Sequence, residues 1–279
     1  MKRFFLRFIS HPSPLRVVLA RKIVKHLSLF TYQDRLQLAA LERPHYGYCI
    51  FQAARLAVLL NISKISVLEF GCGGGRGLLN AEMHIAEIEK VFPIRIELYG
   101  FDNGSGLPQP ADYRDMPHYF KSGLYTMNKQ ALEAKLTRAK LVIGDVRDTC
   151  AKFSKEYDPA PIGCIFHDLD FYSSTWEALK LLDLDDRYLL PRVFMYFDDI
   201  IGDDIWLCNE FTGESLAIKQ FNDNHELKKI SKLPFLLPRY PHERWPYQIY
   251  AFHNFEHARY NDFVANDQQI GHQAGILLN

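Results

Sequence analysis

The sequence predicts an α/β fold with a doubly wound, mostly parallel sheet and an N-terminal helical extension. Three observations support this prediction. Short apolar runs typical of strands recur along the chain, stretches with apolar residues at helical spacing separate them, and each of the first five runs ends in an acidic residue. Strands that alternate with helices pair in parallel through right-handed crossovers. Because ligands bind outside the carboxyl ends of such strands, the acidic residues mark the expected site.

The expected elements follow one another in a regular order. A helix over 46–60 precedes the first strand. The strand-like runs are 65–70, 94–101, 140–143, 162–167 and 192–197, with a last one over 247–252. The helical stretches are 78–91, 128–138, 173–182 and 214–222, and another helix is expected to start near Val146. No internal repeat interrupts this pattern.

Composition limits the class of protein. A chain of 279 residues can form one large domain with short additions. Lys+Arg and Asp+Glu both number 33, so nothing indicates a nucleic-acid partner, which usually requires a basic excess. The five cysteines are odd in number and lack C-x-x-C spacing, which indicates a reducing, cytoplasmic location and no structural zinc.

The N-terminal 42 residues differ from the rest. Basic residues precede the first acidic residue and alternate with apolar ones; they are Lys2, Arg3, Arg7, Arg16, Arg21, Lys22 and Lys25. Arg7 and the prolines at 12 and 14 keep each apolar run too short for a signal-peptide core or a membrane span. Two interpretations remain open. Residues 1–30 form either a basic helix that makes a peripheral contact with an anionic membrane or partner, or a helical extension packed on the domain.

A glycine-rich turn follows the first strand. It reads Glu69-Phe70-Gly71-Cys72-Gly73-Gly74-Gly75, and glycines here let the backbone approach a bound cofactor closely. Glu69 would repel a pyrophosphate but can bind an ammonium or hydroxyl group, and the dinucleotide fingerprint fails because Arg76 stands where glycine is required. The pattern Glu-x-Gly-x-Gly-x-Gly resembles motif I of class I S-adenosylmethionine-dependent methyltransferases, which have a Rossmann-like fold. This resemblance implies that Glu69, Gly71, Gly73 and Gly75 hold that cofactor.

Two further acids extend the expected cofactor site. Asp102 ends the second strand, where an acidic residue can accept both ribose hydroxyls, and Asp145 ends the third, where a carboxylate can accept the adenine amino group. The methyltransferase resemblance implies the same two roles. Asp102 could instead stabilise the turn that follows it, and Asp145 could be the N-cap of the next helix.

Acidic residues also end the fourth and fifth strands. Carboxylates that are buried side by side repel one another, so a divalent cation is expected, and oxygen ligands favour Mg²⁺ or Mn²⁺ over zinc. The chain here resembles the macrocin O-methyltransferase family through Asp168-Leu169-Asp170-Phe171-Tyr172-Ser173-Ser174-Thr175, followed by Phe197-Asp198-Asp199. This resemblance implies that Asp168, Asp198 and Asp199 bind the metal.

The proton acceptor is less directly indicated. The lysine base of catechol-type O-methyltransferases is missing, because Phe171 and Tyr172 stand in its place. Asp170, or Asp168 itself, is therefore the expected catalytic base. The alternative is that Asp170 and Ser173 only cap the helix that follows. His167 is expected to be a buried histidine that is hydrogen-bonded to the backbone.

Together these features predict an S-adenosylmethionine-dependent methyltransferase that methylates a hydroxyl of a small molecule or glycosyl group with metal assistance. Segments 103–127 and 209–214 are the expected acceptor walls, or alternatively contacts with a second copy in a homo-oligomer. A metal-independent N- or C-methyltransferase and a non-catalytic cofactor-binding or membrane-surface protein remain alternatives. The expected organisation is a basic extension over 1–42, a methyltransferase-like catalytic domain over 43–260 and a C-terminal tail over 261–279.

Overall fold

The computed structural model describes residues 15–265, and its centre is a seven-stranded sheet with strand order β3-β2-β1-β4-β5-β7-β6. Strands β1 to β5 are parallel, and β7 lies antiparallel between β5 and β6. The strands are β1 (Lys64–Phe70), β2 (Arg95–Asp102), β3 (Lys140–Ile143), β4 (Ile162–His167), β5 (Leu189–Phe197), β6 (Lys228–Lys232) and β7 (Ile249–Asn254). The predicted doubly wound, mostly parallel sheet is confirmed.

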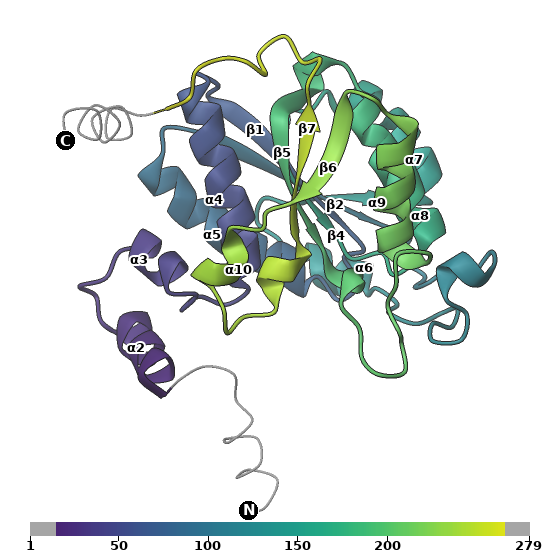
Figure 1. Ribbon diagram of the computed structural model, residues 1–279, viewed down its shortest axis with the longest axis horizontal. Helices are drawn as coiled ribbons and strands as arrows, with labels where there is room; N and C mark the ends of the chain where they lie inside the picture. The colour runs from purple at the N-terminus through teal and green to yellow at the C-terminus, as the bar shows by residue number, and fades with distance from the viewer. Residues whose placement is uncertain (1–14, 266–279) are drawn as a thin grey trace, which may run out of the picture.

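Helices cover both faces of this sheet (Figure 1). Helices α4 and α5 lie on one face, and α7, α8 and α9 lie on the other. The described α-helices are α2 (Leu15–His26), α3 (Tyr32–Gln37), α4 (Pro44–Leu59), α5 (Arg76–Val91), α6 (Lys129–Glu133), α7 (Val146–Tyr157), α8 (Tyr172–Leu179), α9 (Gly213–Asn224) and α10 (Leu236–Arg239). The chain changes direction between β1 and β4, and this switch point is where ligands bind in such sheets.

The sheet is buried because its central strands are apolar on both faces, as parallel strands require. Every residue of β4 is buried, and in β1 only Lys64 is exposed. Tyr46 of α4 stacks on Phe166 of β4 with ring centroids 3.9 Å apart, which fixes α4 across the carboxyl half of the sheet. Burial of an aromatic side chain of this kind stabilises the fold by about 1.5–3 kcal/mol. The site therefore stands on a rigid support.

Some predicted element boundaries were wrong. The helix expected over 128–138 ends at Glu133, because the carboxylate of Glu82 on α5 accepts the backbone N–H groups of Thr137, Arg138 and Ala139 at 2.7–3.1 Å. That contact holds the segment before β3 in a turn. Strand β6 was not predicted, since KKISK has one apolar residue, and its ladder with β7 determines its conformation.

The N-terminal region contains the two short helices α2 and α3. Arg21 of α2 forms a 2.5 Å ion pair with Glu243, which fixes α2 to the segment before β7. Within residues 15–265, no helix combines the length and the apolar character that a bilayer crossing requires. Residues 1–14 of the predicted basic extension and 266–279 of the predicted tail lie outside the described residues. The division at 42 and 260 stays a prediction.

Candidate active site

Two glycines of the turn have neighbours that exclude a side chain, which are backbone atoms at Gly71 and the Leu132 side chain at Gly75. Gly71 has φ +80°, and a Cβ there would lie 1.7 Å from the carbonyl oxygen of Asp168. Gly75 has φ +77°, begins α5, and a Cβ there would lie 2.1 Å from Leu132. L-residues with side chains rarely adopt these φ values. The two glycines therefore shape the turn, and Gly75 itself does not line the cavity beside it.

Gly73 has a different surrounding. It also has positive φ, at +46°, but the nearest atom to a Cβ there is the carbonyl oxygen of Tyr125 at 3.9 Å. At neighbouring Gly74 there is no atom within 4 Å among the described residues. Both glycines line the cavity. The turn thus exposes bare backbone to the cavity, which is the arrangement that a cofactor can approach closely.

Asp102 lies at the end of β2, across from the glycine turn. Its Oδ2 accepts the N–H of Gly73 at 2.8 Å and its Oδ1 accepts the N–H of Gly104 at 2.6 Å. The side chain therefore stabilises the turn after β2, as the alternative interpretation proposed. Each carboxylate oxygen can accept a second hydrogen bond, so Asp102 retains capacity for a ligand hydroxyl.

Glu69 is a buried acid whose hydrogen bonding is incomplete. It is 2% exposed, and its Oε2 has no partner among the described residues. Burial, and then the nearby carboxyl of Asp168, raise the pKa of Glu69 well above its usual value, while Arg43 and a hydrogen bond from Tyr46 oppose this rise. A buried acceptor without a donor is costly. This atom therefore fits a bound ammonium or hydroxyl group.

Asp145 has the structural role that the alternative interpretation gave it. Its side chain accepts the N–H of Arg147 at 2.9 Å and caps α7. The residue is exposed and also lines the cavity. Helix capping and a ligand contact are compatible here, because capping uses only one of its oxygens.

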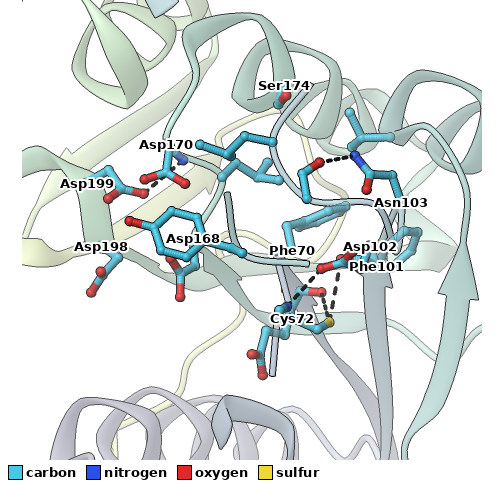
Figure 2. A pocket seen from close by; sticks show the side chains of 18 of the residues that line it. Phe70, Cys72, Phe101, Asp102, Asn103, Asp168, Asp170, Ser174, Asp198 and Asp199 are labelled. Atoms are coloured by element: carbon cyan, nitrogen blue, oxygen red, sulfur yellow. Dashed lines mark hydrogen bonds between the residues drawn. The ribbon is translucent and has the colours of Figure 1, made fainter. Parts of the chain in front are cut away.

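Three acids from neighbouring strands converge beside the turn. Asp168 follows β4, and Asp198 and Asp199 follow β5, which pairs with β4. One carboxylate oxygen of each lies within 4.8 Å of the others. Oxygens bound to one cation at ~2.0–2.6 Å lie at most about twice that distance apart. The three acids can therefore contact a single ion, and Figure 2 shows them across the pocket from Cys72 and Asp102.

Two more carboxyl groups surround this triad. The N–H of Asp170 donates to Asp199 Oδ2 at 2.9 Å, and the N–H of Asp199 donates to Glu214 Oε2 at 3.0 Å. Burial, and then Asp168, raise the pKa of Asp170 to about 7. Glu214 is fully buried, and burial raises its pKa well above its usual value, with Asp199 adding to the rise. Glu214 is the last residue of the predicted acceptor wall 209–214, but the sequence pattern did not predict that it lies beside the three acids. It belongs to α9, whereas the pattern identified acids only at strand ends.

Polar neighbours orient Asp198. The Tyr196 hydroxyl donates to its carboxylate, and Gln248 Nε2 donates to its backbone carbonyl at 2.8 Å. Neither neighbour was predicted.

The interpretation of His167 was wrong in part: it is buried, but neither ring nitrogen has a partner among the described residues. Its ring stacks on Phe197 with centroids 4.5 Å apart, and burial lowers its pKa to about 3.

Segment 103–127 forms an ordered cover over the cavity. Buried Asp115 accepts the N–H and the hydroxyl of Ser173 at 2.8 and 2.9 Å, which joins the segment to the first turn of α8. The interpretation that Asp170 and Ser173 cap this helix was therefore wrong, since its N-cap is Phe171 and Ser173 bonds to Asp115. Phe171 instead packs in a small apolar cluster with Met116 and Phe120 of the cover.

The first predicted acceptor wall meets the loop just before the second, and residues 209–214 themselves do not line the cavity. Tyr119 of the cover stacks on Trp206 with centroids 5.1 Å apart, and the Tyr119 hydroxyl donates to Asp203 at 3.3 Å. Trp206 belongs to the loop between Asp199 and α9 and donates to the sulfur of Met116 at 3.2 Å. The cover and this loop therefore enclose the acidic side of the cavity together.

Most of these groups line one cavity of about 530 Å³. The predicted residues that line it are Glu69, Gly71, Gly73, Asp102, Asp145, Asp168, Asp170, Asp198 and Asp199. Arg43 also lines it and was not predicted, because a single arginine before a helix carries no sequence signal. It is half-buried, in the left-handed conformation, with its guanidinium 5.3 Å from the Tyr46 ring centroid. Arg43 partly balances the acids.

No protein-family model and no curated protein sequence matches the chain. Among solved structures, the O-methyltransferase NovP matches 75% of this chain and 78% of its own length at 14% identity, with a TM-score of 0.51. CalS11, a calicheamicin methyltransferase, matches over 80% and 90% at 22% identity, with a TM-score of 0.47. TomG, an O-methyltransferase from Streptomyces achromogenes, matches over 82% and 86% at 10% identity, with a TM-score of 0.38. The likeness to NovP shows that the two chains share a fold.

Proposed function

We propose that the protein is an S-adenosylmethionine-dependent methyltransferase that methylates an acceptor hydroxyl, on a small molecule or a glycosyl group, with the help of a divalent cation. The observation that carries this proposal is one cavity lined by two different sets of groups. The first set is bare glycine backbone and an oxygen of Glu69 that has no partner among the described residues; the second is three carboxylate oxygens within 4.8 Å of one another. The first set suits a methyl donor, and the second suits a cation that activates an acceptor hydroxyl.

The residues fit the cofactor. Glu69 Oε2 lacks a donor among the described residues, and the amino group of S-adenosylmethionine would supply one. Gly71 and Gly73 would let its backbone approach, Asp102 would accept its ribose hydroxyls, and Asp145 would accept its adenine amino group. NovP, whose fold this chain shares, is described as an O-methyltransferase, which supports this proposal by analogy of fold.

The residues also fit a hard cation. Asp168, Asp198 and Asp199 would hold Mg²⁺ or Mn²⁺, since all three donors are carboxylate oxygens. Without a cation, burial and mutual repulsion raise the pKa values of Asp168 and Asp199 well above the usual range. When bound, the cation would lower the pKa of an acceptor hydroxyl and orient it toward the methyl group.

The chain's own groups would complete the reaction. Asp170 would accept the hydroxyl proton, since it lines the cavity beside the three acids and its backbone N–H is bonded to Asp199. Asp168 is the alternative acceptor. Phe120 and Trp206 line the acidic side of the cavity and would exclude water from it. Arg43 would oppose the accumulated negative charge.

Calorimetry with S-adenosylmethionine, S-adenosylhomocysteine and NADH tests the cofactor. We expect micromolar binding of the first two with one site per chain and no binding of NADH. Tighter binding of NADH, or no binding of either sulfur compound, would contradict the proposal. A metal-independent N- or C-methyltransferase is the outcome if the cofactor binds while Mn²⁺ does not.

A further inference from the structure

Helix α2 has one face that is held against the protein. Val24 is 4% exposed on this face. Arg21 forms its ion pair with Glu243, and its Nε donates to the carbonyl of Leu38 at 2.8 Å. Burial of Val24 and these polar contacts fix the orientation of α2. The docked face therefore determines which side chains of α2 face outward.

A second, outward face of α2 is apolar. Leu19, Ile23 and Leu27 follow one another at four-residue spacing, so they form one stripe along and just beyond the helix. Their side chains are 60%, 46% and 50% exposed, and Leu29 after the helix is 82% exposed. None of them is needed to fill the core. An exposed apolar stripe on an already docked helix is typical of an interaction surface.

The charges of this helix select the partner of the stripe. Lys22 and Lys25 are exposed, and neither forms an ion pair within residues 15–265. The first 33 residues contain seven of the chain's 33 basic residues and none of its 33 acidic residues, so the remainder is net acidic. An anionic surface would attract this end and repel the rest, which fixes one orientation. Two copies meeting through this stripe would instead oppose lysine to lysine.

The position of α2 connects the stripe with the site. Arg21 lines a second cavity of about 660 Å³, which shares Arg43, Asp198 and Trp206 with the first cavity. The loop around Trp206 also exposes Ile205, by 72%, and Leu207, by 66%. Figure 1 shows this loop and α2 along the lower edge of the molecule, at the end of the sheet where the parallel strands finish.

We propose that α2 docks the protein on an anionic phospholipid bilayer. The stripe Leu19-Ile23-Leu27 enters the interface between headgroups and acyl chains, and Lys22 and Lys25 bind lipid phosphates. The second cavity then opens beside the membrane surface. This inference goes beyond the proposed methyl transfer and does not depend on it, since membrane binding needs neither cofactor nor metal.

Co-sedimentation of the full chain with vesicles tests the inference. One set of vesicles contains phosphatidylcholine alone, and the other contains phosphatidylcholine with phosphatidylglycerol. We expect at least tenfold tighter binding to the anionic vesicles, weakened by added salt. Leu19→Ser with Ile23→Ser, and separately Lys22→Glu with Lys25→Glu, should each lower this binding at least tenfold.

Matched controls separate the stripe from general surface effects. Met83→Ser with Val91→Ser changes two exposed apolar residues of α5, and Lys152→Glu with Lys155→Glu reverses two exposed charges of α7. Both control variants should bind vesicles as the original chain does. Melting temperatures and S-adenosylhomocysteine binding check that every variant is folded. Because they are measured separately from vesicle binding, failure of the membrane inference can be distinguished from failure of the proposed function.

Three outcomes would overturn the inference. They are equal binding to neutral and anionic vesicles, no binding to either, and unchanged binding by both α2 variants. A dimer in light scattering that Leu19→Ser with Ile23→Ser dissociates, without vesicle binding by the original chain, would assign the stripe to a second copy of the protein.

Discussion

Gly71 and Gly74 lie three residues apart in the same turn and tolerate side chains very differently. A Cβ at Gly71 would overlap the carbonyl oxygen of Asp168, whereas Gly74 has no atom within 4 Å of such a Cβ among the described residues. Gly71 also has φ +80°. The requirement for glycine at Gly71 therefore comes from the approach of the loop after β4, and not from a cofactor alone.

We expect Gly71→Ala to lower the free energy of unfolding by about 2–4 kcal/mol, because both φ and the backbone overlap oppose a methyl group. Gly74→Ala is the matched control and should change stability by less than about 1 kcal/mol. Urea denaturation followed by circular dichroism measures both. Equal stability of the two variants would show that the turn has a different conformation in solution.

Asp102 should contribute to cofactor binding beyond its structural bonds to Gly73 and Gly104. Asp102→Ala removes the acceptor for ribose hydroxyls, so we expect S-adenosylhomocysteine affinity to fall by about 1–3 kcal/mol, roughly 5- to 150-fold. Asp148→Ala, an exposed acid on α7, is the control. Calorimetry measures both affinities. If Asp102→Ala binds as tightly as the original chain, the residue only stabilises the turn.

The sequence pattern identified some residues of the candidate site and missed others. How each residue is brought to the site explains both outcomes. Asp102, Asp145 and Asp168 could be predicted because strand ends are visible as the end of an apolar run, and parallel topology brings those ends together. Arg43 and Glu214 could not, because their place in the site depends on how α4 and α9 pack. Local sequence carries no record of such packing.

At the scale of elements, the cover formed by residues 103–127 depends on the buried carboxylate of Asp115. Asp115 is 1% exposed and also accepts the N–H of Ala111 at 2.9 Å, in addition to both donors of Ser173. Its negative charge lies near the N-terminus of α8, where the helix dipole favours an anion. One side chain thus adds three hydrogen bonds to the apolar packing of Phe171 that also joins this surface segment to the helix.

We expect Asp115→Ala to loosen the cover, because three donors would lose their acceptor. The free energy of unfolding should fall by about 1–3 kcal/mol. Hydrogen exchange should accelerate most over 103–127 and at the start of α8. Asp112→Ala is the control, since the exposed side chain of Asp112 bonds only to Arg114 among the described residues. Unchanged exchange in Asp115→Ala would mean that apolar packing around Phe120 and Phe171 holds the cover alone.

The elements themselves were predictable where their pattern was long and periodic. The run before Phe70 and the helix after it carry clear apolar periodicity, and both were found. The helix predicted over 128–138 was too long, since the carboxylate of Glu82 on α5 accepts the backbone N–H groups of residues 137–139. Strand β6 is defined by its pairing with β7, and its own sequence does not indicate a strand.

At the scale of the whole molecule, the topology concentrates negative charge. Strands β4 and β5 are neighbours and parallel, so Asp168, Asp198 and Asp199 meet at one end of the sheet. Buried and uncompensated carboxylates cost several kcal/mol. A chain with equal numbers of acidic and basic residues nevertheless retains this arrangement. A bound cation would explain the retention.

We expect Mn²⁺ to bind one site per chain, because three carboxylate oxygens converge there. Asp198→Asn should weaken Mn²⁺ binding at least tenfold, since it removes one ligand charge, while S-adenosylhomocysteine affinity stays within about twofold. Asp223→Asn, an exposed acid on α9, should change neither. Electron paramagnetic resonance of free Mn²⁺ and calorimetry measure the two affinities.

Turnover with an identified acceptor extends this prediction. A chelator should then stop methyl transfer and leave cofactor binding intact, and added Mg²⁺ should restore the rate. If the chelated enzyme methylates at full rate, or if Asp198→Asn binds Mn²⁺ as the original chain does, the triad does not hold a catalytic metal. The carboxyl groups of Asp168 and Asp199, whose pKa values are raised by burial and by neighbouring carboxylates, would then act as proton acceptors without an ion. Metal-independent transfer would become the better explanation of the site.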